Sequence, residues 1–144
     1  MKTISQWFKE AVPAPTIKSL NVQAGCHLEE FGEMLDAITC NAASFDTLKF
    51  LVKEIAKDLK TGVATITVVD HFEMLDGLAD QVVTATGVAH MLGYDFDGAI
   101  GEVNDSNFSK FVNGKAIFDA NGKITKGPGY WKPELSRYLP EPKI

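Results

Sequence analysis

Carboxylate side chains recur at helical spacing in two separate stretches of this sequence. Glu30 and Glu33 are three residues apart in "HLEEFGEML". Asp76 and Asp80 are four residues apart in "HFEMLDGLAD", and Glu73 lies one turn earlier. Residues at these spacings share one face of an α-helix. Carboxylate oxygens from two such helices suit Mg²⁺ or Mn²⁺ and leave coordination positions open for water and a phosphate. The pattern therefore favours a divalent-metal site.

The alternative for each acidic pair is a solvated helix surface. Glu29 and Glu30 lie near an expected helix start, where acidic residues interact favourably with the helix dipole, so this alternative is favoured for the first pair taken alone. It is weaker for Asp76 and Asp80, because the neighbouring "QVVTATGVAHML" is apolar and predicts a buried helix. Buried carboxylates are unfavourable unless a cation offsets their charge.

Apolar residues at helical spacing predict the elements that would carry these acids. We expect helices over residues 4–12, 26–43, 44–62, 65–92 and 95–111. An extended connection is expected between the first two. Ser44 is the expected N-cap of the third helix and Gly62 its end, Gly93 ends the fourth, and Asp95 or Asp97 caps the fifth.

The sequence changes character after residue 112. Residues 113–144 are rich in Gly, Asn and Lys, with a small hairpin expected around "DANG" and a short helix or turn at "PELSRYL". Long irregular segments in compact domains are often functional. The prediction is one all-α domain over residues 1–144, a four- to five-helix bundle-like fold with core helices at about 24–112 and a C-terminal arm.

The net charge of −5 is unevenly distributed along the 144 residues. Residues 1–105 contain 16 acidic and 7 basic residues, whereas residues 106–144 contain 3 acidic and 7 basic residues. Either this is ordinary solvated surface, or carboxylates bind metal while the lysines bind a polyanion. An acidic body without a basic stripe disfavours nucleic acid as a partner.

The apolar runs, the N-terminal segment and the cysteines indicate where in the cell the protein is expected. No apolar run approaches the roughly 20 residues that span a membrane, and the N-terminal "MKTISQWFKE" has no signal-peptide core. Cys26 and Cys40 are the only cysteines, and we expect them to be reduced thiols. A cytoplasmic protein with no membrane partner is therefore expected.

Three segments together resemble a known superfamily. They are "HLEEFGEML", "LDGLADQVVTATGVAHMLGYDFDGAIGEVNDSNFSKF" and "NGKITKGPGYWKPEL". The combination is similar to the all-α nucleoside triphosphate pyrophosphohydrolases, which include MazG-like enzymes, phosphoribosyl-ATP pyrophosphohydrolase-like proteins and dimeric dUTPases. It covers residues 23 to 136 and is closest to short phage- and bacterial-type members. The resemblance implies metal-dependent hydrolysis of a nucleoside triphosphate to a monophosphate and pyrophosphate.

The resemblance also implies partners and cofactors. The substrate would be a (deoxy)nucleoside triphosphate, with dGTP and dUTP as candidates and control of a deoxynucleotide pool as the role. One or more Mg²⁺ or Mn²⁺ ions would be the cofactor. A homo-oligomer is expected, either a dimer or a tetramer built as a dimer of dimers, and the apolar residues of the helix over 65–92 would serve both core and interface.

The acidic residues of the first carboxylate-bearing helix match the superfamily pattern directly. Glu30 and Glu33 match the family's Glu-x-x-Glu metal ligands. Such a reaction needs a general base to take a proton from the attacking water, and one of these two carboxylates would supply it. His27, one turn before Glu30, is expected to line the nucleotide pocket.

The second acidic helix departs from the family pattern at one position. Asp80 matches the Asp of the family's Glu-x-x-Asp motif, and the Glu of that motif falls on Gly77. We expect Asp76 to be the substitute ligand. Glu73 lies one turn earlier and would support the ligands or bind a second ion.

The arm supplies the residues expected to contact the substrate. Asn107 and Lys110 in "SNFSK", and Lys126 and Tyr130 in "KGPGYWKP", match family positions near the nucleotide. Gly127 and Gly129 would let backbone N–H groups approach an anion. The alternative for each lysine is a solvated surface charge, and Trp131 is as well suited to anchor the arm as to stack on a base.

Other classes of protein fit less well. A ferritin-like di-iron site needs Glu-x-x-His pairs, and here the order of His27 and Glu30 is reversed. The sequence contains no Gly-rich phosphate loop followed by Lys-Ser/Thr, which excludes a P-loop nucleotidase. The strongest alternative is a non-catalytic nucleotide-binding or regulatory protein with the same fold, for which Gly77 is the best argument.

Overall fold

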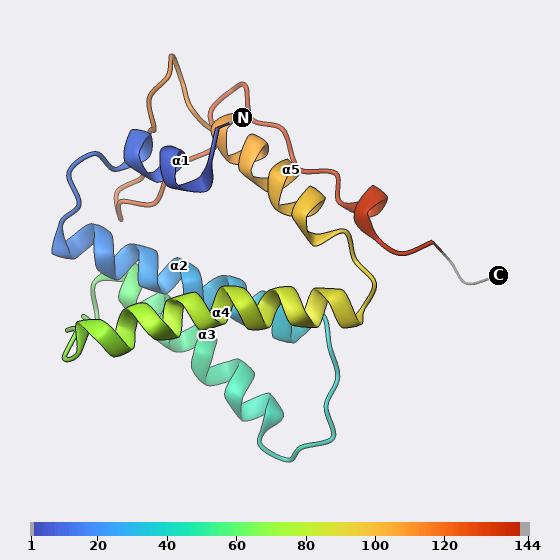
Figure 1. Cartoon of the computed structure of the whole chain (residues 1–144). Helices are drawn as coiled ribbons and strands as arrows, with labels where there is room; N and C mark the ends of the chain where they lie inside the picture. Colours follow the sequence, from blue (N-terminus) through green and yellow to red (C-terminus); the bar gives the residue numbers. More distant parts are fainter. Residues whose placement is uncertain (1, 142–144) are drawn as a thin grey trace. The chain divides into compact units, whose positions relative to one another are not determined.

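The computed structural model describes residues 2–141 and is all-helical in its regular structure. Its order along the chain is α1 (Ile4–Ala11), α2 (Ile17–Asp36), α3 (Phe45–Thr61), α4 (His71–Met91), α5 (Phe96–Phe108) and a short 3₁₀ helix η1 (Ser136–Tyr138) (Figure 1). The all-α prediction is therefore confirmed. These elements belong to two compact units. Unit 2 comprises Val12–Thr67 and Phe118–Thr125, and unit 1 comprises the remaining described residues.

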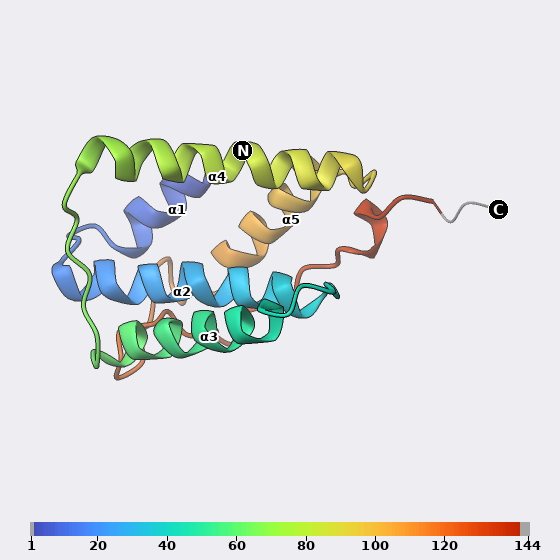
Figure 2. The same cartoon turned by 90° about the horizontal axis from the view of Figure 1, so that it is seen from below.

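Unit 2 is built on an antiparallel pair, α2 and α3, which run side by side in Figure 2. Each helix turns an apolar stripe toward the other, and the buried residues are Val22, Leu35, Val52, Ala56 and Leu59. Glycine on α2 permits a close approach. A Cβ atom at Gly25 would lie 2.7 Å from the Ala56 carbonyl oxygen. The two backbones therefore pack more closely there than any larger residue would allow.

The observed ends of α2 and α3 can be compared with the helix boundaries predicted from the sequence. The predicted Ser44 and Gly62 ends of α3 are confirmed, with Gly62 at a φ of 78°. The predicted start of α2 is wrong, because a capping box at Thr16 and Ser19 begins the helix at Ile17. The Thr16 Oγ1 accepts the Ser19 N–H at 3.1 Å, and the Ser19 Oγ accepts the Thr16 N–H at 2.6 Å.

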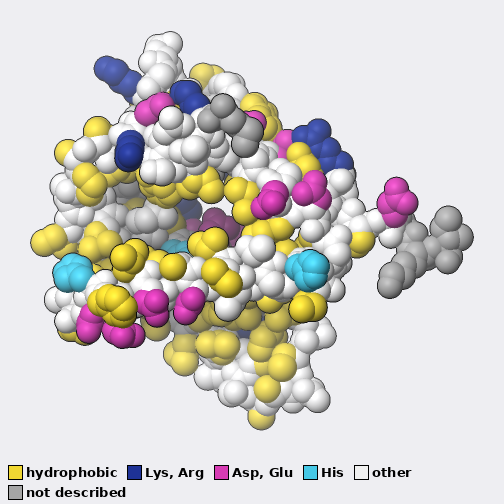
Figure 3. Space-filling model, in the orientation of Figure 1, with side chains coloured by type: hydrophobic (Ala, Val, Ile, Leu, Met, Phe, Trp, Pro, Cys, Tyr) yellow, Lys and Arg dark blue, Asp and Glu magenta, His cyan; other side chains and the backbone are white. Residues whose placement is uncertain are grey.

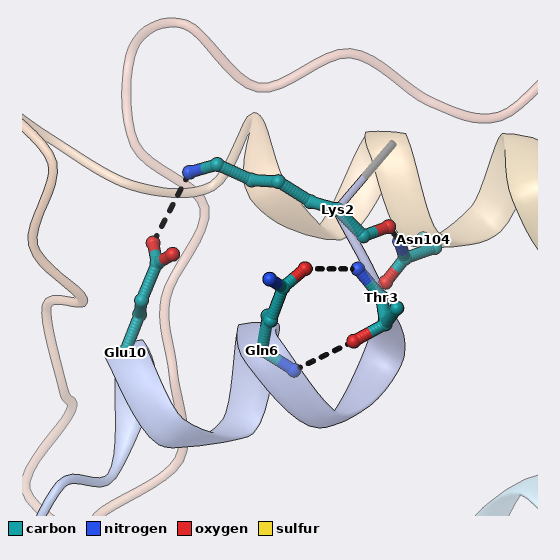
Figure 4. A network of polar contacts seen from close by, with 5 residues as sticks. All are labelled: Lys2, Thr3, Gln6, Glu10 and Asn104. Carbon is teal, nitrogen blue, oxygen red and sulfur yellow. Dashed lines mark hydrogen bonds and ion pairs between the residues drawn. The ribbon is translucent and has the colours of Figure 1, made fainter.

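Unit 1 contains α1, α4, α5 and η1. Trp7 of α1 is buried and stacks on Phe111 just beyond α5, with ring centroids 5.9 Å apart. A polar contact also joins the segment before α1 to α5, since the Asn104 side chain donates to the Lys2 carbonyl at 2.9 Å (Figure 4). Gln6 and Thr3 cap the first turn of α1 reciprocally.

The starts of α4 and α5 follow from aspartate caps. Asp70 accepts the N–H groups of Phe72 and Glu73, so α4 begins at His71 rather than at residue 65 as predicted. Asp95 caps α5 through the Gly98 N–H, which resolves the choice left open between Asp95 and Asp97.

The predicted arm divides between the units. Residues 118–125 belong to unit 2, where the expected small hairpin is present as a bridge between Phe118 and Ile124. From Lys126 onward the arm belongs to unit 1, and η1 lies within the predicted "PELSRYL" turn. One connected segment therefore contributes to both units.

Candidate functional site

The predicted residues of α2 lie on one side of that helix. Glu30 and Glu33 are three residues apart, and His27 is one turn before Glu30. All three side chains are exposed. Glu33 is therefore accessible to a cation or a water molecule. The preceding residue, Gly32, is buried where α2 packs against α3.

The acidic residues of α4 are also exposed, which corrects the expectation that this helix is buried. Glu73, Asp76 and Asp80 are all exposed, and Ala89 is the residue of α4 that is buried. Figure 3 shows acidic side chains on the N-terminal half of α4 and hydrophobic side chains along its length. These carboxylates carry no burial cost to be offset by a cation, because water already solvates them.

The donor set suits a hard divalent cation. Five carboxylates from two helices supply oxygen ligands of the kind that Mg²⁺ and Mn²⁺ prefer. Glu30 and Glu33 belong to unit 2, whereas Glu73, Asp76 and Asp80 belong to unit 1. Within the described residues, no group of three or more His, Cys, Asp or Glu side chains is arranged to hold a metal ion.

The spacing on α4 contains a feature that the sequence comparison missed. Glu73 and Asp76 have the Glu-x-x-Asp spacing of the superfamily that the sequence resembles, one turn before the register that ends at Asp80. With Glu73 and Asp76 as the acidic pair, Gly77 does not occupy the position of a missing carboxylate. A Cβ atom at Gly77 would meet no atom within 4 Å, so the glycine is not required for packing either.

Unit 1 brings together the four expected substrate residues outside α2. The Lys110 ammonium donates to the Asn107 side-chain oxygen at 2.7 Å, just beyond the end of α5. The Lys126 ammonium lies 4.8 Å from the centroid of the Tyr130 ring. The Gly127 N–H donates to the Lys110 carbonyl at 3.2 Å and joins the two pairs.

Close packing explains why a glycine stands at position 127. A Cβ atom there would lie 2.6 Å from Val112 Cγ2, so a larger residue would push the arm away. Its N–H is bonded to Lys110, so the expectation that this group binds an anion is wrong for Gly127. The arm continues along α5, where the Ser106 hydroxyl donates to the Trp131 carbonyl at 2.8 Å and the Trp131 N–H donates to the Ser109 hydroxyl. The Trp131 backbone thus anchors the arm.

Glu29 has a role that its position in the sequence did not reveal. Its carboxylate accepts hydrogen bonds from Lys60 at 2.5 Å and from Lys123 at 2.9 Å, which ties the hairpin turn to α2 and α3. Burial raises the pKa of the Glu29 carboxyl, but the bonds from Lys60 and Lys123 outweigh it and hold this pKa below its ordinary value. Glu29 is thus a structural ion-pair partner.

A second carboxylate with long-range partners holds the end of the arm. Glu102 on α5 accepts the N–H of Glu134 at 3.0 Å and forms an ion pair with Arg137. No spacing rule identifies such a pair, because its members are 35 residues apart in the sequence.

No protein-family model, curated protein or solved structure matches this chain. None of the described helices is long and apolar enough to cross a membrane.

Proposed function

We propose that this protein hydrolyses a nucleoside triphosphate to a nucleoside monophosphate and pyrophosphate. The observation that carries the proposal is the docking of Lys126 and Tyr130 beside Lys110 and Asn107. Two basic segments 16 positions apart in the sequence are held together by the Gly127–Lys110 backbone hydrogen bond, and each carries a lysine that would bind a phosphate of the substrate. The motif resemblance described above supports the same reaction.

A divalent cation fits the donor set of this proposal. Glu30 and Glu33 on α2, and Glu73, Asp76 and Asp80 on α4, would each supply carboxylate oxygens to Mg²⁺ or Mn²⁺, in one or more ions. When bound, the cation would neutralise phosphate charge and lower the pKa of a water molecule.

The chain's own residues would carry out the remaining steps. Glu33 or Glu30 takes a proton from the attacking water, whose oxygen forms a bond to the α-phosphorus. The bond from that phosphorus to the bridging oxygen breaks, and pyrophosphate leaves with the electron pair. Lys110 and Lys126 stabilise the phosphate charge by position and electrostatics, without a covalent nucleophile. His27 and Tyr130 would contact the nucleoside.

Self-association forms part of the proposal. Large apolar side chains on α4 are exposed, including Val82 at 64 % and Met91 at 84 %. A helix that is apolar around most of its circumference is normally buried in a folded protein. A homo-oligomer, a dimer or a dimer of dimers, would cover this surface.

Pyrophosphate release from the common ribo- and deoxyribonucleoside triphosphates, with Mg²⁺ or Mn²⁺, tests the reaction. Turnover in water enriched with the heavy oxygen isotope should place the label in the monophosphate, because attack falls on the α-phosphorus. The comparison also identifies the preferred substrate, including dGTP and dUTP. Glu33→Gln should abolish turnover and retain the fold.

The alternative is a non-catalytic nucleotide-binding protein. Nucleotide binding without turnover of any triphosphate would favour it and would contradict the enzyme proposal.

A further inference from the structure

A cavity of about 470 Å³ lies within unit 2, where α2 begins and α3 ends. The turn between Phe118 and Ile124 contributes Ala120 and Asn121 to its wall. Its volume falls in the range of small-molecule sites. The other lining residues come from α2 and the end of α3, and they are Ile17, Lys18, Asn21, Val22, Leu59, Lys60, Thr61 and Gly62.

A buried amide on the cavity wall has unused hydrogen-bonding capacity. Asn21 is only 6 % exposed, and its side-chain oxygen accepts the Ile66 N–H at 2.9 Å. Its NH₂ group has no acceptor among residues 2–141. Among the described residues, Trp7 Nε1 is the buried side-chain atom without a partner, so the Asn21 NH₂ group is open to solvent at the cavity wall and can donate to an acceptor atom of a ligand.

The start of α2 adds two backbone donors to the same wall. Thr16 satisfies the N–H groups of Ser19 and Leu20. Those of Ile17 and Lys18 have no acceptor in the described part of the chain. Unpaired N–H groups and the positive end of the helix dipole favour an anion.

The charge of the lining agrees with an anion. It includes Lys18 and Lys60 but no Asp or Glu. Lys60 pairs with Glu29, whereas Lys18 forms no ion pair with any described residue. Lys18 Cε lies 3.6 Å from the position of a Cβ atom on Gly122, so the lysine chain extends over the turn. One ammonium group is therefore available to a ligand.

The C-terminal end of α3 carries the negative end of its helix dipole, which disfavours an anion. Hydrogen bonds to its last carbonyl groups weaken this effect. The Asp58 carbonyl accepts the Ala64 N–H at 3.1 Å, and the Lys57 carbonyl accepts the Thr61 hydroxyl at 2.9 Å. The Lys60 ammonium adds positive charge at the same end. Apolar wall comes from Ile17, Val22 and Leu59, beside the polar groups.

We propose that this cavity binds a small phosphate monoester. The phosphate accepts hydrogen bonds from Lys18, the Asn21 NH₂ group and the start of α2, and the apolar body of the ester packs against Val22 and Leu59. A phosphate fits these donors because it carries several acceptor oxygens and a negative charge. The site lies entirely in unit 2, uses none of the proposed catalytic residues and goes beyond the proposed function.

Amide NMR spectra of the full chain, titrated with inorganic phosphate and with phenyl phosphate at constant ionic strength, test the site. Both should give saturable shifts at Ile17, Lys18, Gly62, Asn121 and the Asn21 NH₂ group. Phenyl phosphate should bind about tenfold more tightly, because its ring covers apolar wall. Absence of saturable shifts at these residues up to about 50 mM ligand would overturn the proposal.

Two variants sharpen the test, and neither disturbs the Asn21 bond that holds Ile66. Lys18→Gln should weaken phenyl phosphate binding about tenfold, and Asn121→Ala about threefold. Lys57→Gln is the matched control: the same charge is removed from an exposed lysine of the same unit outside the cavity, and affinity should stay within about twofold. Equal affinity of Lys18→Gln and Lys57→Gln would refute the site, as would shifts confined to Lys126 and Tyr130.

Discussion

At the scale of single residues, three carboxylates on α4 form a stripe on which a Glu-x-x-Asp spacing can be placed in two ways, ending at Asp76 or at Asp80. Glu73, Asp76 and Asp80 follow one another at spacings of three and four. Glu73 and Asp76 already have the Glu-x-x-Asp spacing, so the proposed metal site does not require a carboxylate at Gly77. Asp80 then adds a third carboxylate on the same side of the helix.

Substitutions can separate the two registers. If the proposed metal site is right, Glu73→Gln and Asp76→Asn should each lower kcat/KM for triphosphate hydrolysis at least about 100-fold, because each removes a proposed metal-ligand oxygen. Gly77→Glu should leave kcat/KM within about threefold, and circular dichroism should show an intact helix, since nothing lies near the added Cβ atom. A marked rise in activity for Gly77→Glu would instead assign the motif to the register ending at Asp80.

Glu29 predicts a pH dependence of stability. Its pKa is depressed in the folded protein from the ordinary value of 4.5, so its contribution is present above that value and lost as pH falls through the folded pKa. Glu29→Gln should therefore reduce the free energy of unfolding by about 1 kcal/mol near neutral pH. The difference from the parent protein should shrink below about pH 4.5.

Urea denaturation over a pH series at low salt measures this effect. Glu54→Gln, at an exposed position on α3, is the matched control and should change the free energy of unfolding by less than about 0.5 kcal/mol. A Glu29→Gln difference that is constant from neutral to acid pH would show that the ion pairs with Lys60 and Lys123 contribute nothing.

At the scale of elements, the α2–α3 pair depends on a close backbone contact. Gly25→Ala should destabilise the protein by about 1–3 kcal/mol, because its Cβ atom would overlap the Ala56 carbonyl oxygen, which cannot move without shifting α3. Gly32→Ala is the natural comparison, since its Cβ atom would meet the flexible Lys53 chain at 3.4 Å. Thermal unfolding should show no loss for Gly32→Ala, and a gain of up to about 1 kcal/mol from helix propensity. Equal stability of the two variants would contradict this account of the packing.

At the scale of the whole molecule, α4 presents apolar surface that a second copy would cover. Val82→Lys should shift the protein toward monomer in sedimentation velocity, because it places a charge in the proposed interface. Thr84→Lys, at an exposed position two residues away and so on a different side of α4, should leave the oligomeric state unchanged. A protein that is already monomeric at high concentration before substitution would rule out the interface.

Local signals predicted much of this architecture. Ser44 and Gly62 act within a few residues of their own positions, so the sequence alone identified them as the ends of α3, and it narrowed the cap of α5 to Asp95 or Asp97. The predicted start of α2 was too late, although Ile17, Leu20 and Ala24 continue the apolar spacing of Leu28 and Phe31 toward the N-terminus. The Thr16 capping box was the signal that could have found it.

The sequence by itself determined the helices, the helical spacing of the carboxylates and the basic character of the arm, because these depend on backbone geometry and on neighbours one turn away. Only the tertiary structure decided that Glu29 pairs with Lys60 and Lys123, which lie 31 and 94 residues away. It also decided that the α4 carboxylates are exposed and that Asn21 faces a cavity. Burial and ion pairing depend on which distant segments pack together, and no periodicity within one helix encodes that choice.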